Sequence, residues 1–159
     1  MTGDFHRAVI SECDFTEAEA YLVELPNASS DIVRKALFVA AIIAYGRPFT
    51  KNEMGISPNA SPKVTLLNHH LLSGEQQAMH SHLMTLRNTA IAHSESSRNP
   101  VKLGDVQENG ISFKAEPFQI LNEQICPVQF LALCQRRKKQ AMDTGFIGAQ
   151  AAIPEKDAL

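Results

Sequence analysis

The strongest constraint on the fold is an alanine-rich segment, residues 31–45, that would be apolar on most of its sides as a helix. Its apolar residues repeat at helical spacing in two stripes, one of Val33, Ala36, Leu37, Ala40 and Ala44 and one of Ile32, Val39 and Ile43. Such a helix is expected to be central, because few of its faces suit water. Asp31 is its predicted N-cap, and Gly46 and Pro48 predict its end.

Three further segments predict helices and make the expected fold mostly α. They span residues 16–25, 75–93 and 117–142. Thr16 and Ser73 are each followed three residues later by Glu or Gln, the spacing of a capping box. Pro127 lies inside the last segment and is expected to kink it or split it in two.

Residues 101–116 have a different character. Asn109-Gly110 separates two short segments rich in alternating apolar residues, a strong signal for a β-hairpin. We therefore expect a small two-stranded ribbon appended to the helices. Residues 1–142 are expected to form a single domain, and residues 143–159, which lack clear periodicity, a loose C-terminal tail.

Composition favours a soluble cytoplasmic protein. The longest apolar run, residues 36–45, is shorter than the roughly 20 residues that a membrane span needs, and the first fifteen residues lack the apolar core of a signal peptide. The net charge of −2 argues against a general nucleic-acid coat but allows a local basic patch.

A metal site and a cofactor site are not expected. The three cysteines form no CxxC pair, so a disulfide scaffold and a zinc knuckle are both disfavoured. His69, His70 and His82 have no Asp, Glu or Cys at a helical spacing that would complete a ligand set. A glycine-rich phosphate loop and a nucleophile elbow are also absent from the sequence.

The most informative motif is Arg87-Asn88, followed by four residues and then His93. It resembles the signature of the HEPN superfamily, in which an Arg and a polar residue precede a His by four to six residues. Two other features are similar to small prokaryotic members of that group: the alanine-rich helix that ends at residues 44–49, and His80 upstream of the motif. The resemblance covers about residues 31–94.

The resemblance implies a four-helix, up-and-down bundle that usually forms a homodimer. Many members are metal-independent ribonucleases, including toxin and phage-defence proteins, in which the Arg and the His cleave RNA by using its 2′-hydroxyl. Others are inactive and bind a partner protein or a nucleotide. The expectation is therefore an endoribonuclease acting on RNA, with an antitoxin or another protein as a possible partner. The alternative is a catalytically silent helical dimer.

The residue types suit this chemistry without the resemblance. Histidine titrates near neutral pH and can act as general acid or base. The Arg87 guanidinium can hold a phosphate as negative charge develops, and Asn88 can bind the phosphate or orient the imidazole. Arg87 and His93 are six residues apart, so on a straight α-helix they point about 120° apart. A working site therefore needs a turn at the helix end or a groove shared by two subunits.

Other basic residues are weaker candidates. His80 shares a helix face with Arg87, and Arg47 lies at a helix end, so both are candidate substrate-binding residues. The alternatives are a core histidine and a surface arginine. The run of residues 136–139 is expected near a helix C-terminus, as an RNA-contacting patch or a solvated helix end. Arg87 and His93 themselves have a structural alternative, as an ion-pair partner and a helix-end cation.

Overall fold

The computed structural model describes residues 3–50, 71–91, 101–107, 110–115 and 119–150, and this part of the chain is mostly helical. Its α-helices are α1 (Gly3–Glu24), α2 (Asp31–Gly46), α3 (Gly74–Leu86) and α4 (Pro127–Gln150). Short 3-10 helices follow α1 at Leu25–Asn27 and α2 at Arg47–Phe49, and a third, Ile120–Asn122, precedes α4. A π-helix, Arg87–Ile91, continues directly from α3. None of the helices in these ranges combines the length and the apolar character needed to cross a membrane.

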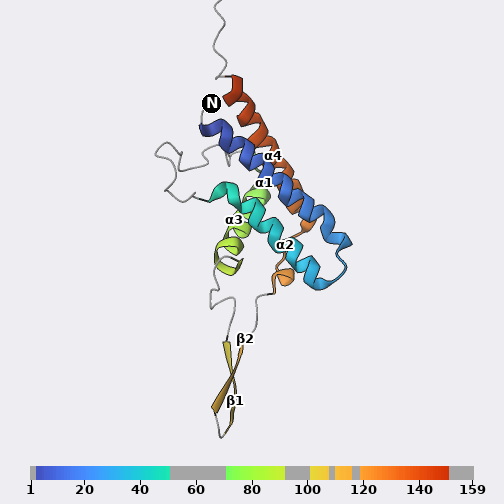
Figure 1. Cartoon of the computed structure of the whole chain (residues 1–159), viewed down its shortest axis with the longest axis vertical. Coiled ribbons are helices and arrows are strands. Elements are labelled where there is room, and N and C mark those ends of the chain that lie inside the picture. Colours follow the sequence, from blue (N-terminus) through green and yellow to red (C-terminus); the bar gives the residue numbers. More distant parts are fainter. Residues whose placement is uncertain (1–2, 51–70, 92–100, 108–109, 116–118, 151–159) are drawn as a thin grey trace, which may run out of the picture.

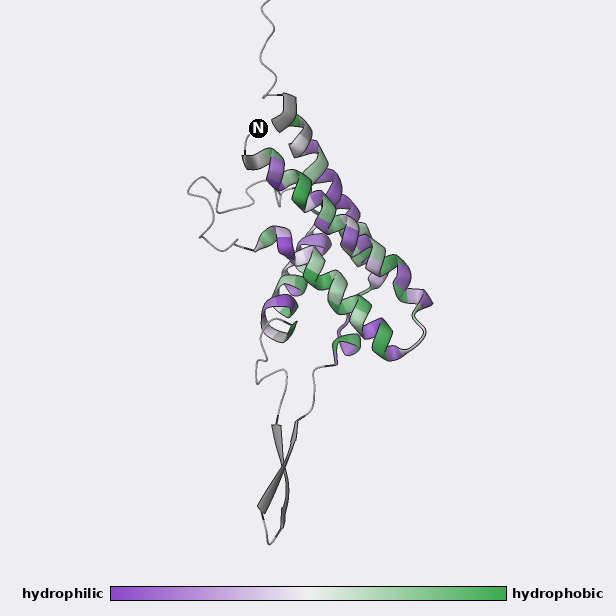
Figure 2. Cartoon of the chain, viewed as in Figure 1, coloured by the Kyte–Doolittle hydropathy of each residue, from purple (hydrophilic) through white to green (hydrophobic). Residues whose placement is uncertain are grey.

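The long helices α1 and α4 lie side by side and run in opposite directions, and α2 turns back against α1 (Figure 1). Apolar residues are frequent along α2, while α1 and α4 alternate between polar and apolar positions (Figure 2). All four helices contribute to one buried core, whose larger members are Phe15, Leu22, Phe38, Ile42, Tyr45, Leu83, Leu86, Phe130 and Leu133. This core fixes the position of α3, which carries the predicted motif at its end.

Two strands, β1 (Val101–Gln107) and β2 (Gly110–Ala115), pair antiparallel. Leu103 lies opposite Phe113, and the register shifts between Leu103 and Val106. The ribbon extends away from the helices (Figure 1). The predicted turn residue Asn109 lies outside the described residues.

The first helix is longer than the sequence predicted. Helix α1 begins at Gly3, and Thr16, the predicted cap, lies inside it. The Thr16 hydroxyl donates instead to the Glu12 carbonyl oxygen at 2.9 Å, one turn earlier. The prediction failed because Ala8, which is 1% exposed, packs against α4 and stabilises a helix that local signals do not mark.

The last helix differs at both ends from the prediction. Helix α4 begins at Pro127, where the missing amide donor is tolerated because the first turn has no intrahelical acceptor for it. Pro127 therefore starts α4 and does not kink or split a helix that begins at residue 117. At the other end α4 continues to Gln150, so the prediction of a loose tail was wrong for residues 143–150. The helix continues because Gly145 packs closely against Ala8 of α1, a contact that stabilises α4 beyond residue 142. Residues 151–159 lie outside the described part.

The prediction for the second helix is confirmed at its C-terminal end, since α2 stops at Gly46. Its N-cap is Ser30 rather than Asp31, because the Ser30 hydroxyl accepts the amide of Val33. The predicted stripes face the core only in part: Ala44 is buried and Leu37 and Val39 pack against the core, but Ile32 is 82% exposed. The buried face consists of Phe38, Ala41, Ile42, Ala44 and Tyr45.

Candidate functional site

The predicted motif begins where α3 changes to a wider helix. The start of α3 is confirmed: Ser73 and Gln76 form both hydrogen bonds of a capping box. The α-helix then ends at Leu86 and Arg87–Ile91 is a π-helix, so the predicted helix is helical as far as Ile91 but is not an α-helix beyond Leu86. Single π-turns are rare and occur often at functional sites. His93 lies outside the described residues.

Arg87 is half-buried at this turn, and Asn88 is exposed. Nη1 of Arg87 donates to Oδ1 of Asn88 at 2.9 Å, so Asn88 orients the guanidinium. Among the residues that the structure describes, no carboxylate forms an ion pair with Arg87. Within the described part of the chain, the positive charge of Arg87 is therefore available to bind an anion from solution.

Gly46 determines where the stem of Arg87 lies. A Cβ atom at position 46 would be 3.2 Å from Cγ and 3.4 Å from Cδ of Arg87, which shows that the stem passes closely over the last residue of α2. Sequence reasoning treated Gly46 only as a helix stop. A motif on one helix gives no signal for a close contact with another helix.

His80 is not placed to contact a substrate directly. It is only 8% exposed, and its Nδ1 lies 2.7 Å from the Tyr45 hydroxyl. Its ring also meets the rings of Tyr45 and Phe49 edge-on, with the Phe49 centroid at 4.6 Å. This geometry fits the alternative of a core histidine.

Arg47 pairs with two carboxylates of α1. Its Nη1 lies 3.2 Å from Asp14 and also bonds to Glu17. The bond to Glu17 is the main reason that the pKa of Arg47 is raised. Burial raises the pKa of Asp14 in spite of its bond to Arg47, while bonds from Tyr21 and then Arg47 lower that of Glu17. Arg47 therefore joins α2 to α1, and two neighbouring carboxylates make it a poor phosphate ligand.

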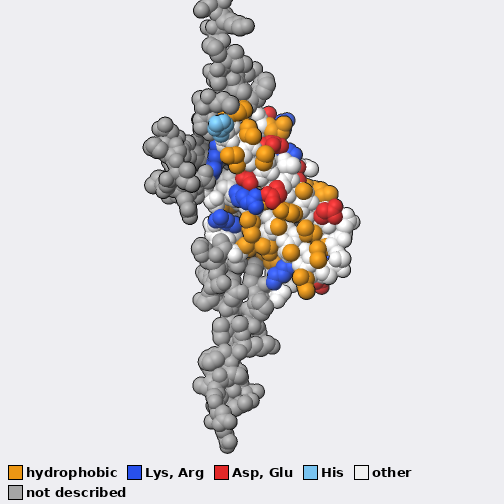
Figure 3. Space-filling view, in the orientation of Figure 1, with side chains coloured by type: hydrophobic (Ala, Val, Ile, Leu, Met, Phe, Trp, Pro, Cys, Tyr) orange, Lys and Arg blue, Asp and Glu red, His pale blue; other side chains and the backbone are white. Residues whose placement is uncertain are grey.

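The basic run at residues 136–139 does not form one patch, and it lies in the middle of α4 rather than at its end. Arg136 is exposed and donates to the carbonyl oxygen of Leu71, whereas Arg137 is fully buried. Lys138 pairs with Glu19 of α1 at 3.1 Å. On the described part of the face in Figure 3, positive and negative side chains likewise lie next to each other.

Arg137 belongs to a buried polar cluster that sequence reasoning missed. Its guanidinium carbon lies 5.3 Å from the centroid of the Phe49 ring, and its Nη1 donates to Oε1 of Gln140 at 3.0 Å. Burial lowers the pKa of Arg137 and raises that of Tyr45. The Phe49 ring, which lies under Arg137, also packs against His80 of α3, so α2 with its 3-10 extension, α3 and α4 meet around these buried polar side chains.

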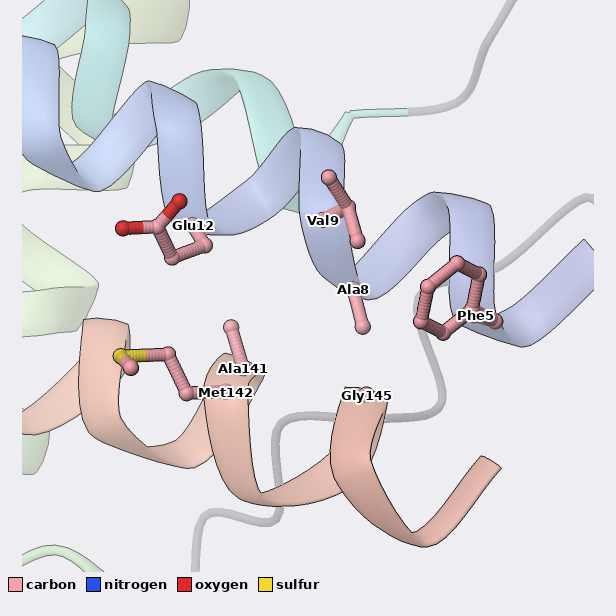
Figure 4. Close-up of a pocket in the computed structure, with 7 residues that line it drawn as sticks. All are labelled: Phe5, Ala8, Val9, Glu12, Ala141, Met142 and Gly145. Carbon is pink, nitrogen blue, oxygen red and sulfur yellow. The ribbon is translucent and has the colours of Figure 1, made fainter. Parts of the chain in front are cut away.

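A cavity of about 420 Å³ lies elsewhere, between α1 and α4. Figure 4 shows Phe5 and Val9 on α1 and Met142 on α4 around it, with Ala8 facing Gly145. Glu12 is the single charged residue among those that line it. The cavity contains none of the predicted site residues and has no pair of groups suited to acid-base catalysis.

The described residues also contain no group of three or more His, Cys, Asp or Glu side chains that could hold a metal ion. Comparisons with protein families, with curated proteins and with solved structures find no match to this chain. The geometry around Arg87 and the resemblance of its motif are therefore the features that indicate a function.

Proposed function

We propose that the chain is a HEPN-like, metal-independent endoribonuclease whose site is formed by Arg87, Asn88 and His93. One observation carries the proposal: Arg87 is partly exposed at a π-turn, is oriented by Asn88, and has no carboxylate partner among the described residues. A buried ion pair at Arg87 would have favoured a structural role instead.

The proposed reaction is an internal attack. The 2′-hydroxyl oxygen of RNA forms a bond to the adjacent phosphorus, and the bond from phosphorus to the 5′-oxygen of the next nucleotide breaks. His93 takes the proton of the 2′-hydroxyl or supplies one to the leaving oxygen. The Arg87 guanidinium stabilises the charge that develops on the phosphate. The products are a 2′,3′-cyclic phosphate and a free 5′-hydroxyl.

The proposed assembly is a homodimer of up-and-down helical bundles in which two copies of the motif line one groove. The substrate is single-stranded or loop RNA, because a flexible backbone lets the 2′-hydroxyl align with the phosphate. The proposal includes a cytoplasmic location and a role in toxin or defence systems, with an antitoxin as partner. The proposed substrate contact leaves out Arg47 and His80, because each has partners within the chain.

The test is RNA cleavage in EDTA by the wild type, Arg87→Ala and His93→Ala. Arg34→Ala is the matched control, because Arg34 is also partly exposed but pairs with Asp31 at the far end of α2. We expect cyclic phosphate ends from the wild type and the control, and loss of cleavage in the other two folded variants. Cleavage that survives both substitutions would exclude this site.

A catalytically silent helical dimer that binds a partner protein or a nucleotide is the second candidate. The observation that favours it is the apolar cavity between α1 and α4, which lies between two exposed apolar side chains, Val9 and Met142. Absence of cleavage of diverse RNAs by a folded wild-type dimer would favour this second function.

A further inference from the structure

Helix α2 has an apolar side that faces away from the core. This outer face of α2 extends over about three helical turns and consists of Ile32, Val33, Ala36, Ala40 and Ile43. Ile32 is 82% exposed, Val33 is 40% exposed, and Ala36 is also exposed. Ala40 and Ile43 are partly exposed. Figure 3 shows hydrophobic side chains gathered over α2 on the face that it presents.

An outer face of this composition is unusual for a helix at a protein surface. Such a helix normally places charged or polar residues on its solvent side, and a helix that is apolar on all sides is normally buried. The sequence predicted a central helix here, yet the outer face of α2 is left exposed in the single chain. Because contiguous exposed apolar side chains mark interaction surfaces, we expect another molecule to cover this face.

The two ends of α2 carry opposite charges. At the N-terminal end the helix has one acidic and two basic side chains, Asp31, Arg34 and Lys35, with a net charge of +1. At the C-terminal end Arg47 is paired with two carboxylates of α1, so this group has a net charge of −1. The helix dipole adds the same signs, positive at the N-terminus and negative at the C-terminus. The apolar face therefore lies between a basic end and an acidic end.

We propose that the outer face of α2 binds the same face of a second copy of this chain, with the two α2 helices antiparallel. A two-fold axis brings one surface of both copies together, so that surface must complement itself. Antiparallel packing puts the basic end of each α2 beside the acidic end of the other, whereas parallel packing would bring like charges together. It also lets Ile32 of one copy meet Ile43 of the partner subunit, with the smaller Ala36 and Ala40 between them.

This interface rests on the homodimer of the proposed function but is independent of ribonuclease activity. The stem of Arg87 lies against Gly46, the last residue of α2. Antiparallel packing therefore places one copy of the motif at each end of the pair of α2 helices. A groove that both motifs line would follow this pair.

The first test is sedimentation of the full chain over a concentration series, for the wild type, Ala36→Glu and Ala78→Glu. Ala78 is the matched control, because it is an exposed alanine inside α3 and the substitution adds the same charge away from α2. We expect a wild-type dimer, an unchanged control, and a dissociation constant at least about 100-fold higher for Ala36→Glu, since two like charges would face each other in the interface.

The outcomes separate this interface from the proposed function. A folded Ala36→Glu that dimerises as tightly as the wild type would overturn the interface but would leave both the dimer and RNA cleavage unaffected. A wild type that stays monomeric at every concentration would overturn the interface and the proposed dimer together. Circular dichroism checks that each variant keeps its helices, which is expected because Ala36 is exposed in the single chain.

Disulfide cross-linking tests the orientation of the two helices. Ile32→Cys and Ile43→Cys are made in a chain whose exposed cysteines, Cys13 and Cys126, are replaced by serine. Each variant is oxidised alone and in an equal mixture with the other. Antiparallel packing predicts a cross-linked dimer in the mixture and none in either variant alone. A cross-link of Ile32→Cys with itself, or no cross-link in a mixture that dimerises, would overturn the antiparallel interface.

Discussion

Replacing Gly46 by Ala separates stability from function at the proposed site. Gly46 is the buried last residue of α2, and the added methyl carbon would lie 3.2 Å from Cγ of Arg87. Ordinary van der Waals contact begins at 3.4 Å, so Cγ must move by at least the difference, 3.4 − 3.2 = 0.2 Å. The atoms that must yield belong to a long flexible side chain, so Arg87 can move without disturbing the core.

The expected magnitudes follow from these distances. Alanine is favoured over glycine in a helix by about 1 kcal/mol, which the displacement of Arg87 partly offsets. The free energy of unfolding should therefore equal that of the wild type or exceed it by up to about 1 kcal/mol. Cleavage should fall by roughly 3- to 10-fold, because a misplacement of about 1 Å at a catalytic group can cost about 100-fold.

The assay pairs urea denaturation with RNA cleavage, and Gly74→Ala is the control. A Cβ at Gly74 would meet no atom within 4 Å, so this variant adds the same methyl group in open space. It should cleave RNA like the wild type. Wild-type cleavage by folded Gly46→Ala would refute the reasoning that this glycine sets the position of Arg87, and a large loss of stability would show that Arg87 cannot yield.

Three further predictions concern stability. Gly145→Ala would place a methyl carbon 3.3 Å from the Cβ of Ala8. The methyl group of Ala8 cannot rotate away, so α1 and α4 must separate slightly. We expect the free energy of unfolding, measured by urea denaturation, to fall by about 1 kcal/mol. A higher urea midpoint than that of the wild type would contradict this. Burial raises the pKa of Cys134 from its ordinary 9.0. The stability that the neutral thiol contributes is therefore present below pH 9.0 and is lost above it, by up to about 1.4 kcal/mol per pH unit. In Cys134→Ala the free energy of unfolding should fall less steeply with pH above 9.0 than in the wild type. The same slope in both proteins would refute this. Ser73→Ala removes the N-cap of α3 and should lower the stability measured in thermal melts by about 1 kcal/mol. Ser81→Ala, in the exposed middle of α3, should lower it less. Equal losses of stability in the two variants would mean that the N-cap does not stabilise α3.

The sequence predicted local events better than long-range ones. The capping box at Ser73 and the end of α2 at Gly46 were predictable because each depends on residues within one helical turn. The start of α1 and the continuation of α4 past residue 142 were missed. Both depend on packing between two helices more than a hundred residues apart in the chain.

The candidate site shows the same division. The sequence alone singled out Arg87, Asn88 and His93 as candidate site residues, because residue type and spacing can be read along one segment. Only the tertiary structure decided that His80 is buried against Tyr45 and that Arg137 lies inside the core. The physical reason is that a residue's chemistry belongs to its side chain, whereas its burial and its partners depend on which helices pack against it.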